Sequence, residues 1–583
     1  MVMVNGASSP GSASRRRSGS QVDLTPHNVT DEEPPHARFH EPDFQLQLAI
    51  SKGLVEDLVY VLESSSLHSE PGSRIRTLYL QAVKLSRYQD PSTRTVGLVG
   101  NSGVGKSSLL NSLLDRRGFA RTSNSGAACT CVVTEYHYHE NANFALEVEY
   151  FTQEEIREQF TELLQSYRSH HLHEHDDDTS MTADDCGDLQ EKAKAAKDTF
   201  RAAFRNHLTQ NERFLLDDPE EHVLQTLLTW AVSTGLPVVG GTNMVPRTEF
   251  ARAEVFSNHL MGLTSEPADA SEPSKWPFIR KISRVYLNAY ILSKGLVLVD
   301  LPGLRDLNSA RLKITERYLL HCDEIFAVCN IGRATTDPGV KEVFELAKRA
   351  SLSKIGIVCT RSDEIHADEE ERDRGEGIRN EIRRLRRNVD DLKKVAEATE
   401  SEIDDNTPDG NVDDDINDEM RSKLVSLNAT RKTTRRRLAM AKFELIRYLV
   451  TTRNQKVTGE LQKLYQNQIA TANLPVFCIS NIIYQDHRDK PKAEALPYLQ
   501  LSGILQVRRH CLSLVAEGQL RAATEYVTNA IPALLGSIEL WIQAGAGSVG
   551  AERKQAIRGA LDRIEDELEA VSALARQSNQ DRG

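Results

Sequence analysis

The sequence predicts an α/β fold in which a doubly wound sheet carries a phosphate-binding P-loop, with helical insertions and helical segments at both ends. Apolar runs at 95–99, 296–299, 355–359 and 475–479 are short, and each is followed by polar or glycine-containing residues. This pattern is typical of buried parallel strands. The first run leads into GNSGVGKS at 100–107 and then into an amphipathic stretch at 108–114, so strand, glycine loop and helix follow in order.

The glycines of this loop explain how it would bind phosphate. Gly100, Gly103 and Gly105 let the backbone turn its amides toward a β-phosphate, and the helix N-terminus adds partial positive charge. Lys106 reaches the β- and γ-phosphates, and Ser107 offers a hydroxyl to Mg²⁺. The alternative is a chance glycine-rich turn, which the match of eight positions and both flanks disfavours. The other loop residues expected to contact the nucleotide are Asn101, Ser102, Val104 and Ser108.

Two stretches downstream would complete the site around the metal ion. The run 296–299 delivers DLPG at 300–303, in which Asp300 holds the Mg²⁺ shell and the Gly303 amide senses a γ-phosphate. A switch threonine should lie in a loop just before a strand, where its hydroxyl reaches Mg²⁺. Thr130 fits best, with Thr122 and Thr134 as the other candidates, and a threonine that only leads into the strand is the alternative.

Two further stretches would select the base. The run 355–359 ends in TRSD at 360–363, where Asp363 can accept two hydrogen bonds from guanine in a pair that adenine cannot return. Arg361, next to Thr360, stands where this motif has Lys, and its flat guanidinium can lie over the base. The run 475–479 leads to Ser480 and Asn481, where a backbone amide would donate to the guanine carbonyl. The sequence therefore predicts guanine, with GTP and GDP as ligands.

The segments GKSSLLNSLL, SGAACTCVVTEY, GLVLVDLPGLRDLNSAR, VCTRSD and FCISN together resemble the dynamin-like large GTPases, and most closely the group around the nuclear GTPase SLIP-GC with its fungal relatives. The resemblance runs from about residue 43 to about residue 541. It implies a GTP-hydrolysing domain with helical elaboration. It also suggests a homodimer or larger assembly through the GTPase face or the helical segments.

Two departures from related GTPases bear on catalysis. Small GTPases position the attacking water with a Gln after DxxG, and here that position is Leu304. Dynamins proper use a Gln-Ser pair in the phosphate loop, and here those positions are Ser102 and Gly103. We therefore expect slow hydrolysis that a partner or assembly stimulates, with Lys106, Ser102 and Thr130 as the catalytic candidates. Other possible donors are Arg305, Asp306, Asn308, Arg311 or a residue from a partner molecule. A nucleotide-dependent switch or scaffold with little turnover is the alternative, and an ATPase is a weaker third interpretation.

Composition limits the remaining choices. The chain has 583 residues and a net charge of −12, which disfavours broad nucleic-acid binding. Its eight cysteines are scattered, as in reduced intracellular proteins. We see no run apolar enough to span a bilayer and no apolar secretory core at the N-terminus. The sequence thus predicts an intracellular, soluble protein of the nucleus or cytoplasm, and the basic cluster at 15–17 is compatible with nuclear import.

The expected domain order follows from these patterns. Residues 132–138 and 144–151 alternate in polarity around 141–143, which predicts an antiparallel β-hairpin at one edge of the sheet. Apolar residues spaced by three and four along 378–403, a helix-breaking NTPDG at 406–410 and a matching return stretch predict an antiparallel helical hairpin. The predicted parts are a disordered tail (1–41), N-terminal helices (42–92), the GTPase domain (93–500) with a helical insertion (152–275) and the hairpin insertion (366–470), and a C-terminal helical segment (501–583).

Overall fold

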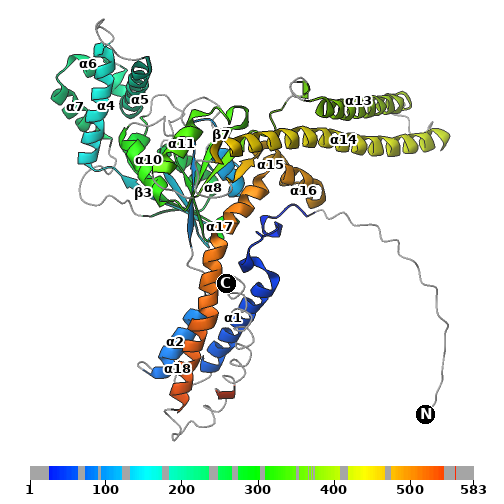
Figure 1. The fold of residues 1–583 in the computed structure, drawn as a ribbon, viewed down its shortest axis with the longest axis horizontal. Coiled ribbons are helices and arrows are strands. Elements are labelled where there is room, and N and C mark those ends of the chain that lie inside the picture. Colours follow the sequence, from blue (N-terminus) through cyan, green and yellow to red (C-terminus); the bar gives the residue numbers. More distant parts are fainter. Residues whose placement is uncertain are drawn as a thin grey trace.

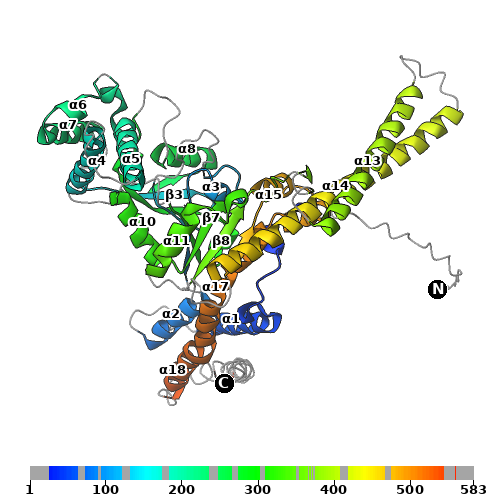
Figure 2. The same ribbon diagram turned by 45° about the horizontal axis from the view of Figure 1, so that its top comes forward.

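The architecture comes from a computed structural model of the chain (Figure 1). A central α/β domain carries a group of helices on one side and a long pair of helices that projects from the other side, with a third helical part below it (Figure 2). The structure describes residues 25–63, 73–88, 93–120, 132–173, 183–209, 211–234, 247–264, 273–302, 309–349, 354–365, 367–368, 371, 375–407, 418–466, 474–543 and 558–559.

The α/β domain is built on a nine-stranded sheet with the order β4-β3-β5-β2-β6-β1-β7-β8-β9. Its parallel half, β6-β1-β7-β8-β9, contains the four apolar runs that the sequence predicts as strands. The strands are β1 (Arg94–Val99), β2 (Thr134–Tyr138), β3 (Phe144–Tyr150), β4 (Thr248–Phe250), β5 (Ile279–Leu287), β6 (Leu296–Asp300), β7 (Glu324–Asn330), β8 (Ile355–Thr360) and β9 (Val476–Cys478).

The predicted β-hairpin between β2 and β3 is wrong. Strand β5 lies between them, parallel to β2 and antiparallel to β3, while β2 also pairs antiparallel with β6. The connection at 139–143 therefore passes over the end of a strand that enters the sheet more than a hundred residues later. Five residues can reach across the roughly 10 Å between alternate strands, so the loop length fits both arrangements.

Helices cover both faces of the sheet, as a doubly wound fold requires. Alternate side chains of one strand enter different cores, so Val96 and Leu98 join one and Val99 joins the other. The first core contains residues of α3 (Lys106–Leu113), α8 (Ala253–Thr264), α9 (Tyr290–Ser293), α15 (Asn481–His487), α16 (Lys492–Leu501) and α17 (Ile504–Glu525). The second contains residues of α10 (Ser309–His321), α11 (Pro338–Arg349) and the end of α14 (Asp418–Tyr465).

A separate cluster of aromatic side chains holds the helical group beside β3. Phe160, Phe200 and Phe204 are buried there, and Phe160 and Phe204 both meet Phe278, just before β5. This contact fixes the group to the edge of the sheet. Its helices are α4 (Gln153–His173), α5 (Ala183–Leu208), α6 (Phe214–Asp217) and α7 (Glu220–Ser233).

The projecting pair consists of α13 (Glu376–Asp405) and α14, which lie side by side along α13 (Figures 1 and 2). Ile382, Leu385, Thr399 and Ile403 of α13 are buried, at positions that share one face of a helix. Glu400 and Arg435 form an ion pair between the two helices. Helix α14 has 48 residues, so it is about 72 Å long and continues from the pair into the second core of the domain.

The third helical part has a core of its own. Helices α1 (Pro42–Glu63), α2 (Arg74–Ser86) and α18 (Ile531–Gln543) bury Leu58, Leu78 and Ile538, among other apolar side chains. Helix α17 runs from the domain to this bundle and joins α18 through a π-helical turn at Tyr526–Ala530. Within the residues that the structure describes, no helix combines the length and apolarity that a bilayer crossing needs.

Part of the predicted disordered tail is ordered. Residues 25–41 contain two 3-10 turns, Val29–Asp31 and Arg38–His40. They lie against the C-terminal part of the chain, where Arg508 binds Glu32 and Lys492 Nζ lies 2.9 Å from Asp31 Oδ2. The prediction is therefore wrong for 25–41, because charge pairing with distant helices supplies what its own composition lacks. Residues 1–24 lie outside the described part.

Candidate functional site

The phosphate loop leaves the carboxyl end of β1, between β6 and β7. In an open α/β sheet this edge is where ligands bind, and neighbouring strands deliver their polar side chains to it. Strand β6 ends at Asp300, whose Cα pairs with Leu98 of β1. Strand β8 ends at Thr360, paired with Asn330 of β7. The sheet thus brings the predicted metal and base residues to the edge that carries the loop.

The loop has a shape that demands glycine. A Cβ on Gly100 would lie 2.1 Å from the carbonyl oxygen of Val328, so a side chain would collide with β7. Gly103 and Gly105 have φ angles of 77° and 97°, in the left-handed region that other residues rarely adopt. Gly105 is also the N-cap of α3. The loop therefore approaches β7 closely and turns its backbone toward the end of α3.

Lys106 begins α3 and is buried. Its Nζ donates to the carbonyl oxygens of Gly100 at 2.6 Å and of Asn101 at 3.2 Å, so the ammonium lies folded over the loop. Both bonds are to backbone oxygens of the segment that would surround a phosphate, so the charge lies beside that segment. Ser107 follows in the first turn of α3 and is also buried.

The residues present fit a magnesium ion. Ser107 and Asp300, only 9% and 3% exposed, supply a hydroxyl and a carboxylate, the oxygen ligands that Mg²⁺ prefers. Among the described residues, no group of three or more His, Cys, Asp and Glu is arranged so that it could hold a metal ion by itself. A set this small suits a magnesium ion that shares its shell with water and nucleotide phosphates. Thr134, a candidate switch residue, pairs with Asp300 across β2 and β6 but directs its hydroxyl to Val132 O at 3.2 Å.

Thr360 and Arg361 tie the base-specifying loop to the phosphate loop. Thr360 Oγ1 donates to Val104 O at 2.6 Å and to Cys329 O at 3.1 Å. Arg361 has a φ of 60°, and its Nη2 donates to Gly103 O at 3.1 Å. Arg361 therefore contacts the phosphate loop directly.

Asp363 is half-buried within the same loop. The amide of Ser362 donates to Ile479 O at 2.9 Å, and the amide of Ile479 donates to Cys359 O at 2.8 Å. These bonds join the loop to the end of β9, so Asp363 and the segment at 480–481 are held as one unit.

Ser480 and Asn481 use their side chains to build structure. Ser480 Oγ accepts from Ile483 N at 3.0 Å and caps α15, while the Ser480 amide donates to Ser502 O at 2.8 Å. Asn481 Oδ1 accepts from Ser112 Oγ of α3 at 2.8 Å. Asn481 begins α15, where the first backbone amides lack intrahelical partners.

Several predicted residues cannot be placed. Thr130 and Gly303 lie outside the described residues, as do Thr122, Leu304, Arg305, Asp306 and Asn308. Arg311 lies in α10, where only the backbone is described. The sequence analysis missed Arg453 of α14, which donates to the base-specifying loop. Its sequence signal is weak, since it is one of many charged residues on a long helix.

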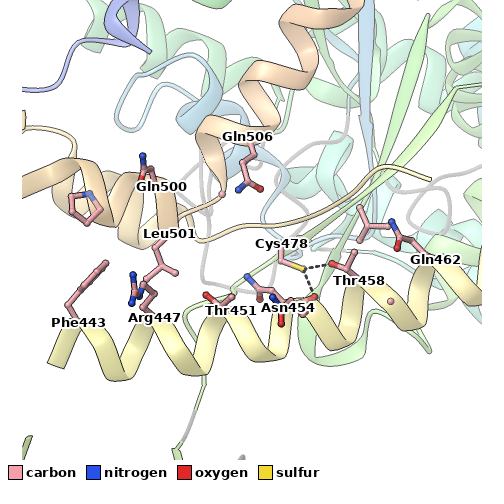
Figure 3. A pocket seen from close by; sticks show the side chains of 15 residues that line it. Phe443, Arg447, Thr451, Asn454, Thr458, Gln462, Cys478, Gln500, Leu501 and Gln506 are labelled. Carbon is pink, nitrogen blue, oxygen red and sulfur yellow. Dashed lines mark hydrogen bonds between the residues drawn. The ribbon is translucent and has the colours of Figure 1, made fainter. Parts of the chain in front are cut away.

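A pocket of 540 Å³ is lined by residues of α14, β9, α16 and α17 and includes none of the residues of the phosphate loop. It separates one face of α14 from α16 and α17, and its lining is mostly uncharged and polar (Figure 3). At its floor Cys478 contacts Thr458 Oγ1 at 3.7 Å and Asn454 O at 4.0 Å. The hydrogen bond with Cys359 is the main cause that lowers the pKa of Cys478, against the opposing effect of burial.

Comparisons with known proteins agree with the motifs. The model of the Dynamin family matches residues 96–360. The nuclear GTPase SLIP-GC of Homo sapiens is 22% identical over 291 residues, which are 48% of this chain and 34% of that protein. Its Mus musculus counterpart is 28% identical over 113 residues, 19% of this chain and 14% of that protein. The chain thus spans about a third or less of these curated relatives.

Two shorter or more distant similarities complete the comparison. The probable GTP-binding protein EngB of Ligilactobacillus salivarius is 49% identical over 47 residues, 8% of this chain and 24% of that protein. A solved chain from an oligomerised bacterial dynamin pair is 14% identical with a TM-score of 0.38, covering 92% of this chain and 63% of that chain. The ordered motifs converge at one sheet edge within or next to the stretch 96–360, the part of the chain that is similar to the Dynamin family.

Proposed function

We propose that the chain binds GTP with Mg²⁺ and hydrolyses it to GDP and phosphate. The observation that carries the proposal is the direct link between the two ends of the site. Thr360 Oγ1 donates to Val104 O at 2.6 Å and Arg361 Nη2 to Gly103 O at 3.1 Å. A single nucleotide is bound at its base and at its phosphates, so the two loops that bind these parts must keep a fixed separation. The two hydrogen bonds would hold the loops at such a separation. The Dynamin family match over 96–360 supports the same activity.

Each residue has a role in this proposal. Lys106 neutralises charge on the β- and γ-phosphates, and the loop amides bind the remaining phosphate oxygens. Asp363 selects guanine and Arg361 covers it. Mg²⁺, held by Ser107, Asp300 and Thr130, would neutralise the charge that develops during transfer. The other proposed nucleotide contacts are Gly100, Asn101, Ser102, Gly103, Val104, Gly105, Ser108, Gly303, Thr360, Ser480 and Asn481.

Hydrolysis by the isolated chain should be slow. Position 304 is Leu, which cannot orient water, and Ser102 offers only a hydroxyl in the loop. A preorganised donor contributes on the order of 3 kcal/mol to such a reaction, so its absence slows turnover by 10²-fold or more. We propose that a second copy of the chain or another partner supplies the missing group across the nucleotide face.

Phosphate release at increasing protein concentration tests this proposal. GTP with Mg²⁺ is the substrate, ATP is the control nucleotide, and Lys106→Ala is the blank because it removes the phosphate-binding charge. We expect specific activity with GTP to rise with protein concentration in the wild-type chain only. Activity equal to that of the blank at every concentration, with GTP still bound, would instead favour the switch or scaffold.

The wider assignment follows the same reasoning. We propose that residues 93–500 form the GTPase domain, with the helical insertion at 152–275 and the hairpin insertion at 366–470. We also propose that the helical segments at 42–92 and 501–583 flank this domain. Assembly would use the nucleotide face or these helical segments. The nuclear location printed in the name of the SLIP-GC relatives makes the nucleus, besides the cytoplasm, the place to look for the chain.

A further inference from the structure

The long helix α14 reaches into the base-specifying loop through one side chain. Arg453 Nη1 donates to Glu364 O at 2.7 Å, and its Nη2 donates to Ser362 O at 2.8 Å and lies 3.4 Å from Arg361 O. The three carbonyl groups come from residues on both sides of Asp363. The guanidinium therefore fixes the backbone that carries the base-selecting carboxylate.

This loop needs an external support. Arg361 adopts a φ of 60°, which a residue with a side chain rarely does, so the conformation is not one the loop prefers by itself. On its inner side the loop is held by the amide of Ser362, which donates to Ile479 O at 2.9 Å. On its outer side Arg453 supplies hydrogen bonds in a fixed fork, which suits two carbonyl groups at once.

The same helix forms the projecting hairpin with α13. Beyond Arg453 its C-terminal end is anchored in the domain, where Leu461 and Tyr465 are buried and Tyr465 stacks on Phe344 with ring centroids 4.2 Å apart. The 540 Å³ pocket lies along α14 on both sides of Arg453 in the sequence, where Arg447, Thr451 and Thr458 line it (Figure 3). Arg453 is not among the residues that line this pocket, and it hydrogen-bonds this stretch of α14 to the base-specifying loop.

We propose that Arg453 is a positioning residue for guanine, and that it makes base recognition depend on the position of the α13–α14 hairpin. The inference rests on the proposed binding of guanine nucleotides. Arg453 touches no part of the base; it acts through the carbonyl groups around Asp363. A movement of the hairpin that shifts Arg453 would reorient the Asp363 carboxylate. Because coupling is reciprocal, guanine binding would in turn restrict the motion of α14.

The test compares GDP with inosine diphosphate, which lacks the exocyclic amino group of guanine. Asp363 accepts from that amino group, so its correct aim appears as a preference for GDP. In Arg453→Ala we expect the affinity for GDP to fall about tenfold and that for inosine diphosphate to fall less, so that their ratio shrinks. Arg453→Lys should keep only part of the preference for GDP. The lysine ammonium can still donate a hydrogen bond, but it lacks the planar fork with which arginine binds two carbonyl groups at once.

Arg447→Ala is the matched control, since Arg447 lies on the same helix, is exposed and lines the pocket instead of the loop. An unchanged ratio in Arg453→Ala, with either unchanged or equally weakened binding of both nucleotides, would overturn the proposal. If Arg453→Ala does not fold, the ratio in Arg453→Lys decides in the same way. A wild-type chain that binds neither nucleotide would refute the proposed function itself, and the inference with it.

Hydrogen exchange tests the dependence on the hairpin. Coupling between two sites is reciprocal, so GDP should slow amide exchange in α13 and α14 of the wild-type chain. The slowing should be absent from Arg453→Ala at a GDP concentration that saturates this variant, and present in Arg447→Ala. Equal slowing in wild type and Arg453→Ala would show that the hairpin does not communicate with the base through Arg453.

Discussion

At Gly100 the phosphate loop comes so close to β7 that one added methyl group should disable it. A Cβ there would lie 2.1 Å from Val328 O, a backbone atom that cannot rotate away. We expect Gly100→Ala to destabilise the fold by about 1–3 kcal/mol, as overpacking does, and to abolish tight GDP binding. Thermal unfolding and GDP titration would measure both effects.

Gly53→Ala is the control for that substitution. Gly53 lies within α1, and a Cβ there would meet no atom within 4 Å. Alanine is favoured over glycine inside a helix, so the free energy of unfolding of this variant should rise by about 0.5–1 kcal/mol. The variant should bind GDP as the wild type does. Normal GDP binding by Gly100→Ala would contradict the placement of the loop against β7.

The residues that a site residue contacts can lie near it or far from it in the sequence. A role can be predicted from sequence when those contacts are near, and not when they are far. The site of Lys106 is predictable because its glycines and its helix are adjacent in sequence. Asp363 is predictable because a buried strand precedes it. Arg453 is not, because the carbonyl groups that it binds lie 89 to 92 residues away and any residue could provide them.

Among the elements, the N-terminal segment is held to α17 by a buried ion pair. Burial alone would raise the pKa of Glu32, but the hydrogen bond from His27 and the charge and hydrogen bond of Arg508 together lower it. Arg508 is completely buried and also donates to Ser112 O at 2.7 Å, at the end of α3. The ion pair therefore connects the N-terminal segment to the helix that begins at the phosphate loop.

The pH dependence of unfolding should expose this pair. A carboxylate whose pKa is lowered in the fold stabilises the protein above its unfolded pKa, here near 4.5, and that contribution is lost as the pH falls through the folded value. Glu32→Gln should cost on the order of 3 kcal/mol at pH 7, since it leaves Arg508 buried without a carboxylate. The difference from wild type should narrow below pH 4.5, as followed by denaturant unfolding.

Glu33→Gln is the comparison for Glu32→Gln. Glu33 pairs with Arg509 at 2.5 Å, but its side chain is 63% exposed, and exposed pairs contribute about 0–1 kcal/mol. This variant should therefore be nearly as stable as wild type at every pH. A gap between wild type and Glu32→Gln that stays constant down to pH 3 would contradict the assigned role of the carboxylate.

Elements built from local patterns were predictable, and those that depend on distant partners were not. The seam of the helical hairpin follows from residue spacing, and Ile382, Leu385 and Ile403 are buried where that spacing places them. The order of the edge strands does not follow from spacing. Alternating polarity identifies β2 and β3 as strands, but their partner β5 comes from far along the chain, and nothing in the two strands specifies it.

At the scale of the whole molecule, we expect the stability of the α1–α2–α18 bundle to be independent of nucleotide affinity. Its core shares no residue with the two cores beside the sheet among the described residues. Leu58→Ala removes a side chain that is 0% exposed there and should cost about 2–5 kcal/mol. Calorimetry should show this loss in thermal unfolding, while GDP affinity remains that of the wild type.

Leu46→Ala provides the reference for this variant. Leu46 lies on the same helix but is 59% exposed, so its removal should change stability by less than about 0.5 kcal/mol. A loss of GDP affinity in Leu58→Ala, beyond that in Leu46→Ala, would show that the bundle and the site form one energetic unit.

The ion pair between Glu32 and Arg508 can form only late in the synthesis of the chain. The two residues are 476 positions apart, so the ribosome must add that many residues before the pair can form. At about 5–20 residues per second this takes on the order of half a minute to a minute and a half. During that interval the nascent N-terminal segment has no α17 to bind. Chaperones that recognise emerging chains can therefore bind this segment throughout that interval.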